Sequence, residues 1–187
     1  MTYDIILAGV GGQGVLSVAA VIAQAAMLDN LNVRQSEVHG MSQRGGAVLS
    51  HLRISDTVIP GDLVPKGSAD MILSMEPLEA LRYLDYLAPE GVCVTADDPV
   101  VNIPDYPEID TVLNAVNKLP AHRLVATKEL AKSAGSPRTA NIVMVGAASA
   151  YLPLKKETIE KSVEVLFASK GADVIDMNKK AFAAGSA

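Results

Sequence analysis

The sequence has few aromatic residues and one cysteine, and both scarcities limit what the chain can be. It contains no tryptophan, two phenylalanines and five tyrosines among 187 residues, while 49% of the residues are hydrophobic. A core of this composition must be built from aliphatic and small side chains. Cys93 is alone, which excludes an internal disulfide framework and any iron–sulfur cluster held by this chain by itself. Because it lies in an apolar, strand-like run, we interpret it as an inert core thiol.

Charge is also sparse and carries no strong positive bias. The net charge is −5 with a pI near 5.2, which argues against a nucleic-acid or anionic-membrane partner. No charged residue occurs between Asp4 and Asp29, but glycines and Gln13 divide this apolar run, and no basic residue precedes Arg34. A membrane span or signal peptide is therefore disfavoured. We expect a cytosolic protein that forms one domain over residues 1–187.

The most informative stretch is a strand, a glycine-rich turn and a helix. Ile5–Ala8 predicts a buried strand, and Val15–Leu28 predicts a helix covered on most sides, partly by another subunit. The turn between them contains Gly9, Gly11, Gly12, Gln13 and Gly14, in which three glycines fit G-x-G-x-x-G. Such glycines let the backbone approach a ligand, and the helix N-terminus favours an anion such as a phosphate. The alternative is a tight turn that binds nothing.

The residues after this helix allow a nucleotide-binding interpretation. Asn32–Glu37 predicts a second strand, which would complete a βαβ unit with parallel strands. Glu37 lies 23 residues after Gly14, about where a dinucleotide-binding fold places the acid that contacts a ribose. This spacing favours a nicotinamide or flavin cofactor.

A second glycine-rich segment, Val38–Val48, weakens that interpretation. It places polar side chains between glycines, and these residues are His39, Ser42, Gln43 and Arg44 with Gly40, Gly45 and Gly46. Glycines allow close approach of the backbone, and Arg44 offers a planar set of donors for an anion. We predict a second site loop here, although His39 considered alone is more typical of an ordinary loop histidine.

The chain continues with alternating strands and helices. Ala47–Ile54 predicts a strand that turns at Asp56–Thr57 into a hairpin arm, Val58–Ile59. Asp70–Met75 predicts a buried strand, and Glu76–Pro77 predicts the start of a helix in which leucines recur up to Leu87.

Two later segments bear on the site. Asp97-Asp98-Pro99 follows the strand Gly91–Thr95, and we interpret it as a solvated turn. Ser136–Pro137 predicts the start of a helix that extends to Tyr151. Asn141 lies in the first turn of this helix, where it serves either as a capping or packing residue or as a contact to the glycine turn.

Common catalytic motifs are absent from the sequence. There is no phosphate-binding GxxxxGK[ST] loop, no GxSxG nucleophile elbow and no CxxC pair, and His39, His51 and His122 lack metal-ligand spacing. The chain therefore predicts a protein that positions part of a substrate or cofactor while another chain breaks the bonds.

Four stretches together resemble a known family. They are Asp4–Leu16 (DIILAGVGGQGVL), Gln35–Val48 (QSEVHGMSQRGGAV), Met75–Leu87 (MEPLEALRYLDYL) and Arg138–Ala148 (RTANIVMVGAA). The combination is similar to the gamma-type domain of 2-oxoacid:ferredoxin oxidoreductases, above all to its indolepyruvate branch. This resemblance implies a three-layer α/β/α sandwich with a mostly parallel, Rossmann-like sheet and a β-hairpin insertion.

The resemblance also implies an activity and partners. Such enzymes decarboxylate a 2-oxoacid on thiamine diphosphate, pass electrons through iron–sulfur clusters to ferredoxin and release an acyl-CoA. The implied chain holds no cofactor of its own, forms the coenzyme A side of the site, and assembles with a larger subunit that carries thiamine diphosphate and clusters. The implied site residues are Gly9, Gly11, Gly12, Gln13, Gly14, His39, Ser42, Gln43, Arg44, Gly45, Gly46 and Asn141, with no catalytic role assigned.

Three hypotheses stay open at this stage. The first is a small subunit for indolepyruvate or for another 2-oxoacid, such as pyruvate, 2-oxoglutarate or a branched-chain acid. The second is a self-sufficient nicotinamide or flavin dehydrogenase that uses Glu37. The third is an interaction scaffold with a vestigial loop.

Overall fold

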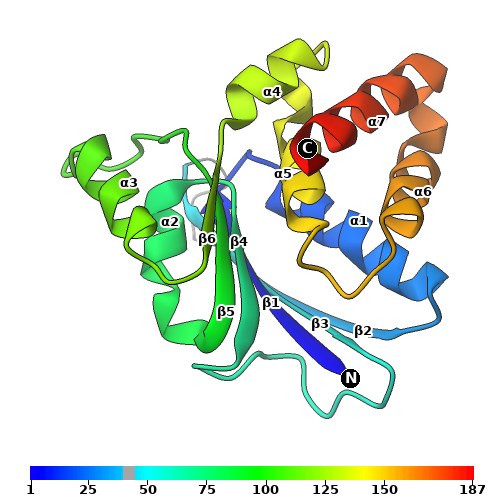
Figure 1. The fold of residues 1–187 in the computed structure, drawn as a ribbon, viewed down its shortest axis with the longest axis horizontal. Coiled ribbons are helices and arrows are strands. Elements are labelled where there is room, and N and C mark those ends of the chain that lie inside the picture. The colour runs from blue at the N-terminus through cyan, green and yellow to red at the C-terminus, as the bar shows by residue number, and fades with distance from the viewer. Residues whose placement is uncertain (40–44) are drawn as a thin grey trace.

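A computed structural model of the chain describes residues 1–39 and 45–187 (Figure 1). The strands are β1 (Thr2–Val10), β2 (Asn32–His39), β3 (Ala47–Ser55), β4 (Ala69–Ser74), β5 (Leu87–Ala96) and β6 (His122–Val125). The helices are α1 (Val15–Leu28), α2 (Pro77–Arg82), α3 (Ile109–Asn117), α4 (Thr127–Ser133), α5 (Ala140–Ala148), α6 (Lys156–Phe167) and α7 (Ala172–Ser186). Three short 3₁₀ turns cover Leu84–Tyr86, Pro137–Thr139 and Ala168–Lys170.

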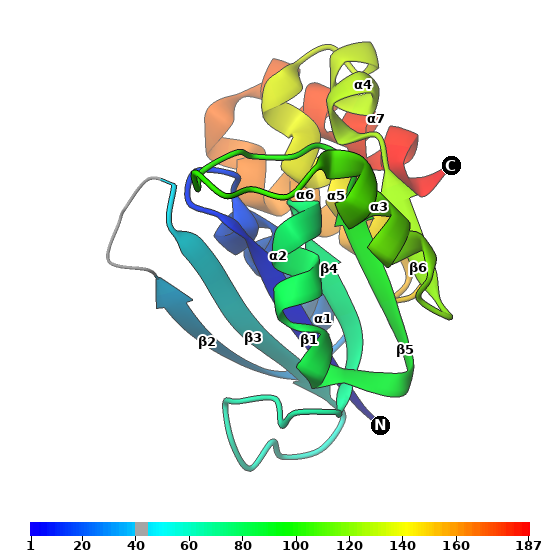
Figure 2. The same cartoon turned by 90° about the vertical axis from the view of Figure 1, so that its left-hand side faces the viewer.

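The described strands form one sheet in the order β2-β3-β1-β4-β5-β6. β1, β4, β5 and β6 pair in parallel, whereas β3 runs antiparallel to both β1 and β2. The mostly parallel sheet with a hairpin is therefore confirmed. Helices α1, α4, α5, α6 and α7 lie on one face, and α2 and α3 lie on the other, which completes the α/β/α sandwich (Figures 1 and 2).

Alternation along the central strands explains the two cores. Ile5 and Leu7 of β1 pack into the cluster beneath α1 and α5, while Ile6 between them points to the opposite face, towards α2. Ile72 of β4 joins Ile6 on that face, and Cys93 of β5 lies beside them. All five side chains are completely buried, so both faces of the sheet are covered by apolar groups.

Two expectations about strand pairing are wrong. Asn32–Glu37 does form a strand, but it pairs antiparallel with β3 and does not touch β1, so no parallel βαβ unit forms there. The hairpin is β2–β3, and Val58–Ile59 lies in an irregular loop with Val58 exposed. Ile59 is buried nonetheless, which shows that its apolar character reflects packing of the loop rather than strand pairing.

The helix that begins at Glu76–Pro77 is shorter than its leucine spacing predicts. The Glu76 side chain caps α2 and Pro77 occupies the first turn, as expected, but α2 ends at Arg82. A 3₁₀ turn follows, and Leu87 already belongs to β5, where it pairs with Ala69. Strand pairing thus overrides the helical spacing at Leu87.

Helix α1 is buried by other parts of the same chain. Its apolar residues pack against the sheet and α5, and Ser162 of α6 donates a hydrogen bond to the carbonyl oxygen of Val21 at 3.0 Å. The same chain therefore covers most of α1, and the further cover that we expect from another subunit stays a prediction. In the described part of the chain, no helix combines the length and apolarity that a membrane crossing demands.

Candidate functional site

The first glycine-rich turn joins the carboxyl end of β1 to α1 as predicted. Gly12 and Gly14 have φ values of 102° and 82°, which L-residues with side chains rarely adopt. A Cβ placed on Gly12 would have no atom within 4 Å, so this position faces open space. Helix α1 begins without a side-chain cap and without an acidic residue in its first turn. The positive end of its dipole is therefore not neutralised by a local carboxylate.

Gln13 fixes the shape of this turn. Its Oε1 accepts a hydrogen bond from the amide of Val10 at 2.7 Å, and its Nε2 donates to the carbonyl oxygen of Met75 at 2.8 Å. The Oε1 of Gln13 also lies close to Gly9, because a Cβ on Gly9 would be 3.0 Å from it. Gln13 therefore ties the turn to the end of β1 through its Oε1 and to the residue after β4 through its Nε2.

The second glycine-rich segment meets the first turn at the same edge of the sheet. The amide of Gly11 donates to the carbonyl oxygen of Gly46 at 2.8 Å. Asn102, in the β5–α3 connection, donates to the carbonyl oxygen of Gly45 at 2.8 Å. His39 is the last residue of β2. The other predicted members of this loop, Ser42, Gln43 and Arg44, lie outside the described residues, as does the side chain of His39.

Asn141 contacts the glycine turn, which was the sharper of its two interpretations. A Cβ on Gly14 would lie 2.9 Å from the Nδ2 of Asn141, so only a glycine fits beside this side chain. The Oδ1 of Asn141 accepts from the amide of Ile142 at 3.0 Å. Asn141 thus connects the start of α5 with the start of α1.

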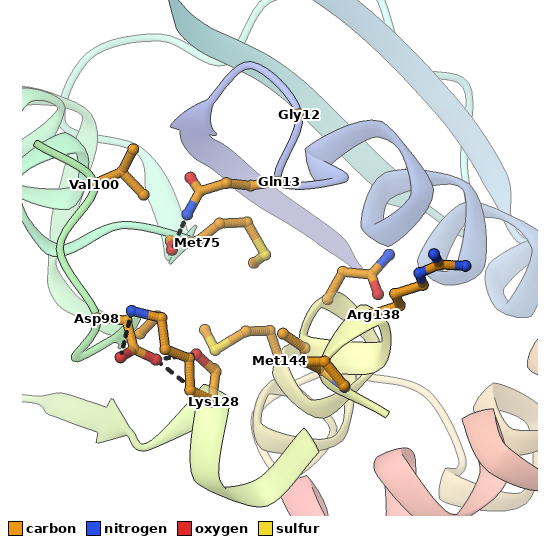
Figure 3. Close-up of a pocket in the computed structure, with 13 residues that line it drawn as sticks. Gly12, Gln13, Met75, Asp98, Val100, Lys128, Arg138 and Met144 are labelled. Atoms are coloured by element: carbon orange, nitrogen blue, oxygen red, sulfur yellow. Dashed lines mark hydrogen bonds and ion pairs between the residues drawn. The ribbon is translucent and has the colours of Figure 1, made fainter. Parts of the chain in front are cut away.

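These elements enclose a cavity of about 370 Å³ at the carboxyl edge of the sheet (Figure 3). Its lining combines the glycine turn with the ends of β4 and β5, the β5–α3 connection, α4 and the start of α5. The lining residues are Gly12, Gln13, Met75, Ala96, Asp98, Val100, Thr127, Lys128, Pro137, Arg138, Ala140, Asn141 and Met144. Half of the side chains in this lining are apolar and supply most of its surface, and Met75 and Met144 face each other across its centre (Figure 3).

Charged groups lie on opposite sides of this apolar cavity (Figure 3). On one side, the Nζ of Lys128 is 3.1 Å from the Oδ1 of Asp98. The Oδ2 of Asp98 accepts from the hydroxyl of Thr127 and the amide of Lys128, both at 3.0 Å. On the other side, Arg138 is exposed and forms no ion pair with a described residue. The cavity can therefore hold an elongated ligand with an anionic part and an apolar part.

Sequence reasoning missed the charged residues of this cavity. The interpretation of Asp97-Asp98 as a solvated turn is wrong, because Asp98 anchors the first residues of α4. Burial, and next the charge of Asp98, raise the pKa of Asp97. A usable signal did exist, because Asp98 and Lys128 lie within three residues of the carboxyl ends of β5 and β6, and open α/β sheets bind ligands at these ends.

Glu37 is separated from the glycine turn by a whole strand. It lies opposite Ser50 of β3, and Ser50 in turn lies opposite Leu7 of β1. A dinucleotide-binding fold instead places the ribose-binding acid at the end of the strand next to β1. The arrangement therefore disfavours a self-sufficient nicotinamide or flavin dehydrogenase.

Cys93 belongs to the core rather than to the cavity. Cys93 is buried, and burial raises the pKa of its thiol to about 12, so it is an inert core residue as predicted. Among residues 1–39 and 45–187, no group of three or more His, Cys, Asp or Glu side chains could hold a metal ion.

The chain is an α/β protein with a glycine-lined cavity at the carboxyl edge of its sheet. Sequence comparison identifies its family. The profile of the pyruvate ferredoxin/flavodoxin oxidoreductase family matches residues 4–187, so the chain belongs to this family. Among relatives, the indolepyruvate oxidoreductase subunit IorB of Thermococcus kodakarensis is 38% identical, over 98% of this chain and 94% of its own.

Solved structures share this fold. The gamma subunit of a keto/oxoacid ferredoxin oxidoreductase from Geobacter sulfurreducens superimposes with a TM-score of 0.70 and 28% identity, over 98% of this chain and 96% of its own. The 2-oxoglutarate:ferredoxin oxidoreductase of Magnetococcus marinus, solved with 2-oxoglutarate, coenzyme A and succinyl-CoA, gives a TM-score of 0.76 and 22% identity. The match covers 98% of this chain and 30% of that longer chain.

Proposed function

We propose that the chain is the small subunit of a cytosolic indolepyruvate ferredoxin oxidoreductase. Such a complex oxidatively decarboxylates an aryl-pyruvate, transfers the acyl group to coenzyme A and reduces ferredoxin. The observation that carries this proposal is 38% identity to an indolepyruvate oxidoreductase subunit over nearly the full length of both chains. Residues 1–187 act as one gamma-type domain, and thiamine diphosphate and iron–sulfur clusters reside in a larger partner subunit.

The cavity at the sheet edge supports a specific role for this chain, namely binding of coenzyme A. Arg138 and Lys128, the latter also paired with Asp98, supply positive charge for phosphate groups, and the uncapped N-terminus of α1 adds a positive dipole. The methionine-lined centre suits an uncharged, flexible arm. Gly11, Gly12 and Gly14 then allow the backbone to approach the ligand closely.

The test uses the complex reconstituted with its larger subunit. Lys128→Ala and Arg138→Ala each remove one cation, so the KM for coenzyme A should rise about three- to tenfold, with little change in the KM for indolepyruvate. Lys132→Ala is the matched control, because Lys132 is exposed in the last turn of α4 and does not line the cavity. An unchanged KM for coenzyme A in both cation variants would show that this cavity does not bind coenzyme A.

The substrate itself needs a separate experiment. Pyruvate, 2-oxoglutarate and branched-chain 2-oxoacids are the alternatives, and a substrate panel on the reconstituted complex distinguishes them by kcat/KM. We expect the lone chain to turn over none of them. Turnover by the purified chain without its partner would overturn the proposal and restore the self-sufficient dehydrogenase.

A further inference from the structure

The short turn between β4 and α2 is bonded to the glycine turn through its backbone. The amide of Met75 donates to the carbonyl oxygen of Ala8 at 2.9 Å. The carbonyl oxygen of Met75 accepts from the side-chain amide of Gln13 at 2.8 Å. One wall of the cavity, formed by Gly12 and Gln13, is thereby fixed to the end of β4 (Figure 3).

The next residue, Glu76, holds a second part of the cavity lining, next to the glycine turn, through its side chain (Figure 3). Its carboxylate is buried, with a residue exposure of 1%. Oε2 accepts from the amide of Glu79 at 2.7 Å and caps α2. Oε1 accepts from the amide of Val100 at 3.3 Å and from the hydroxyl of Tyr106. Val100 lines the cavity, so a single carboxylate joins the β4–α2 turn to the β5–α3 connection.

The strength of this connection follows from burial. A carboxylate removed from water is costly unless hydrogen-bond donors surround it, and here two amides and one hydroxyl do so. Burial and the hydrogen bond to Glu76 raise the pKa of the Tyr106 phenol, so the hydroxyl keeps its proton and remains a donor at neutral pH.

The β5–α3 connection also reaches the second glycine-rich segment. It extends across the carboxyl ends of β4 and β1 (Figure 2). Asn102, between the two residues that bond to Glu76, donates to the carbonyl oxygen of Gly45. The β5–α3 connection is therefore held at three points. Val100 and Tyr106 bond to the buried Glu76, and Asn102 between them bonds to Gly45.

We propose that Glu76 is a positioning residue which, with Tyr106, fixes the place of Val100 beside the glycine turn and thereby sets the affinity of the site for its ligand. This inference rests on the proposed binding of coenzyme A. Glu76 itself does not line the cavity, so its effect is transmitted through the backbone of Val100.

Tyr106→Phe isolates this role in the reconstituted complex. The change removes the hydroxyl donor but keeps the ring and leaves the α2 cap intact. We expect the KM for coenzyme A to rise about three- to tenfold, because only part of the free energy of the lost charge-assisted hydrogen bond reaches the ligand, while kcat stays within about twofold. The KM for the 2-oxoacid should not change. Tyr151→Phe, on an exposed tyrosine after α5, is the matched control.

Amide hydrogen exchange supplies a second measurement that does not depend on coenzyme A. Exchange at Val100 should become about tenfold faster in Tyr106→Phe and stay unchanged in Tyr151→Phe. Unchanged exchange at Val100 would overturn the inference. So would an unchanged KM for coenzyme A in Tyr106→Phe when Lys128→Ala and Arg138→Ala raise it. If those cation variants have no effect, the proposed function itself fails, and the exchange result alone decides whether Glu76 positions Val100.

Discussion

Glycine is required in two regions of this molecule for opposite reasons. Where α5 crosses α7, a Cβ on Gly146 would lie 2.2 Å from the carbonyl oxygen of Phe182, and one on Gly185 would lie 1.9 Å from that of Val143. At the sheet edge, a Cβ on Gly12 or Gly45 would have no atom within 4 Å, but both residues have positive φ. Glycine permits close packing in the first region and an unusual backbone path in the second.

This comparison distinguishes glycines that are needed for stability from glycines that are needed for ligand binding. The α5–α7 crossing is buried and lined by apolar side chains such as Phe182 and Ala147, so extra volume there has nowhere to go. The space beside Gly12 belongs to the cavity proposed to bind coenzyme A. Added volume should therefore destabilise the folded protein in one region and weaken ligand binding in the other.

The largest effect is expected at the helix crossing. Gly146→Ala and Gly185→Ala each push a methyl group against backbone atoms of the facing helix, so the two helices must separate. Overpacking typically costs about 1–3 kcal/mol, and contacts this short with backbone place these variants at or above the upper end of that range. Urea denaturation measures the loss in the free energy of unfolding.

Gly61→Ala is the control for these variants. Gly61 has open space beside its Cα and no positive φ, so alanine there should change the free energy of unfolding by less than about 0.5 kcal/mol. A loss at Gly61 as large as at Gly146 would show that close packing is not the cause.

Gly12→Ala should give a smaller stability loss with a functional consequence. Alanine at a φ of 102° is strained by about 1–2 kcal/mol, and its methyl group enters the cavity. We expect a modest fall in Tm together with a rise in the KM for coenzyme A of the reconstituted complex.

Gly67→Ala separates the two parts of that prediction. Gly67 has a φ of 74° and the same open space, but it lies in the β3–β4 loop, away from the cavity. It should reproduce the fall in Tm without any change in KM. A raised KM in Gly67→Ala would mean that the effect at Gly12 is only a consequence of lower stability.

Local sequence signals predicted the parts of the fold that local interactions determine. The strand, turn and helix around Gly14 and the α2 start at Glu76–Pro77 are both present. Each depends on residues close in sequence or on a backbone conformation that few residue types adopt.

Pairing between distant segments was predicted less well. The alternation in Asn32–Glu37 indicates a strand but not its neighbour, so the antiparallel pairing with β3 was missed. The cavity residues Asp98, Lys128 and Arg138 come from three separate segments, and no spacing along the chain links them. Strand order decides which loops meet at one edge, and that order is a property of the whole sheet.

The two regions should also differ in their response to pH, because the sheet-edge region contains a buried carboxylate pair. Glu79 lies in α2 one turn after Glu76; its Oε1 is 3.0 Å from the Nε of Arg82, while its Oε2 has no hydrogen-bond partner among the described residues. Burial raises the pKa of Glu79 above its ordinary 4.5, and repulsion from Glu76 adds to this, against the opposing charge of Arg82.

A raised carboxyl pKa means that the native state binds this proton more tightly than the unfolded chain does. The stability from this group is therefore fully present below pH 4.5 and is lost as the pH rises through the native pKa. Glu79→Gln removes the titration, so the fall in the free energy of unfolding from acidic to neutral pH should become shallower than in the parent protein. Glu90→Gln, on an exposed carboxylate of β5, should leave the pH profile unchanged. An identical slope in all three proteins would mean that the Arg82 ion pair already compensates for burial, and that charge does not distinguish the sheet edge from the helix crossing.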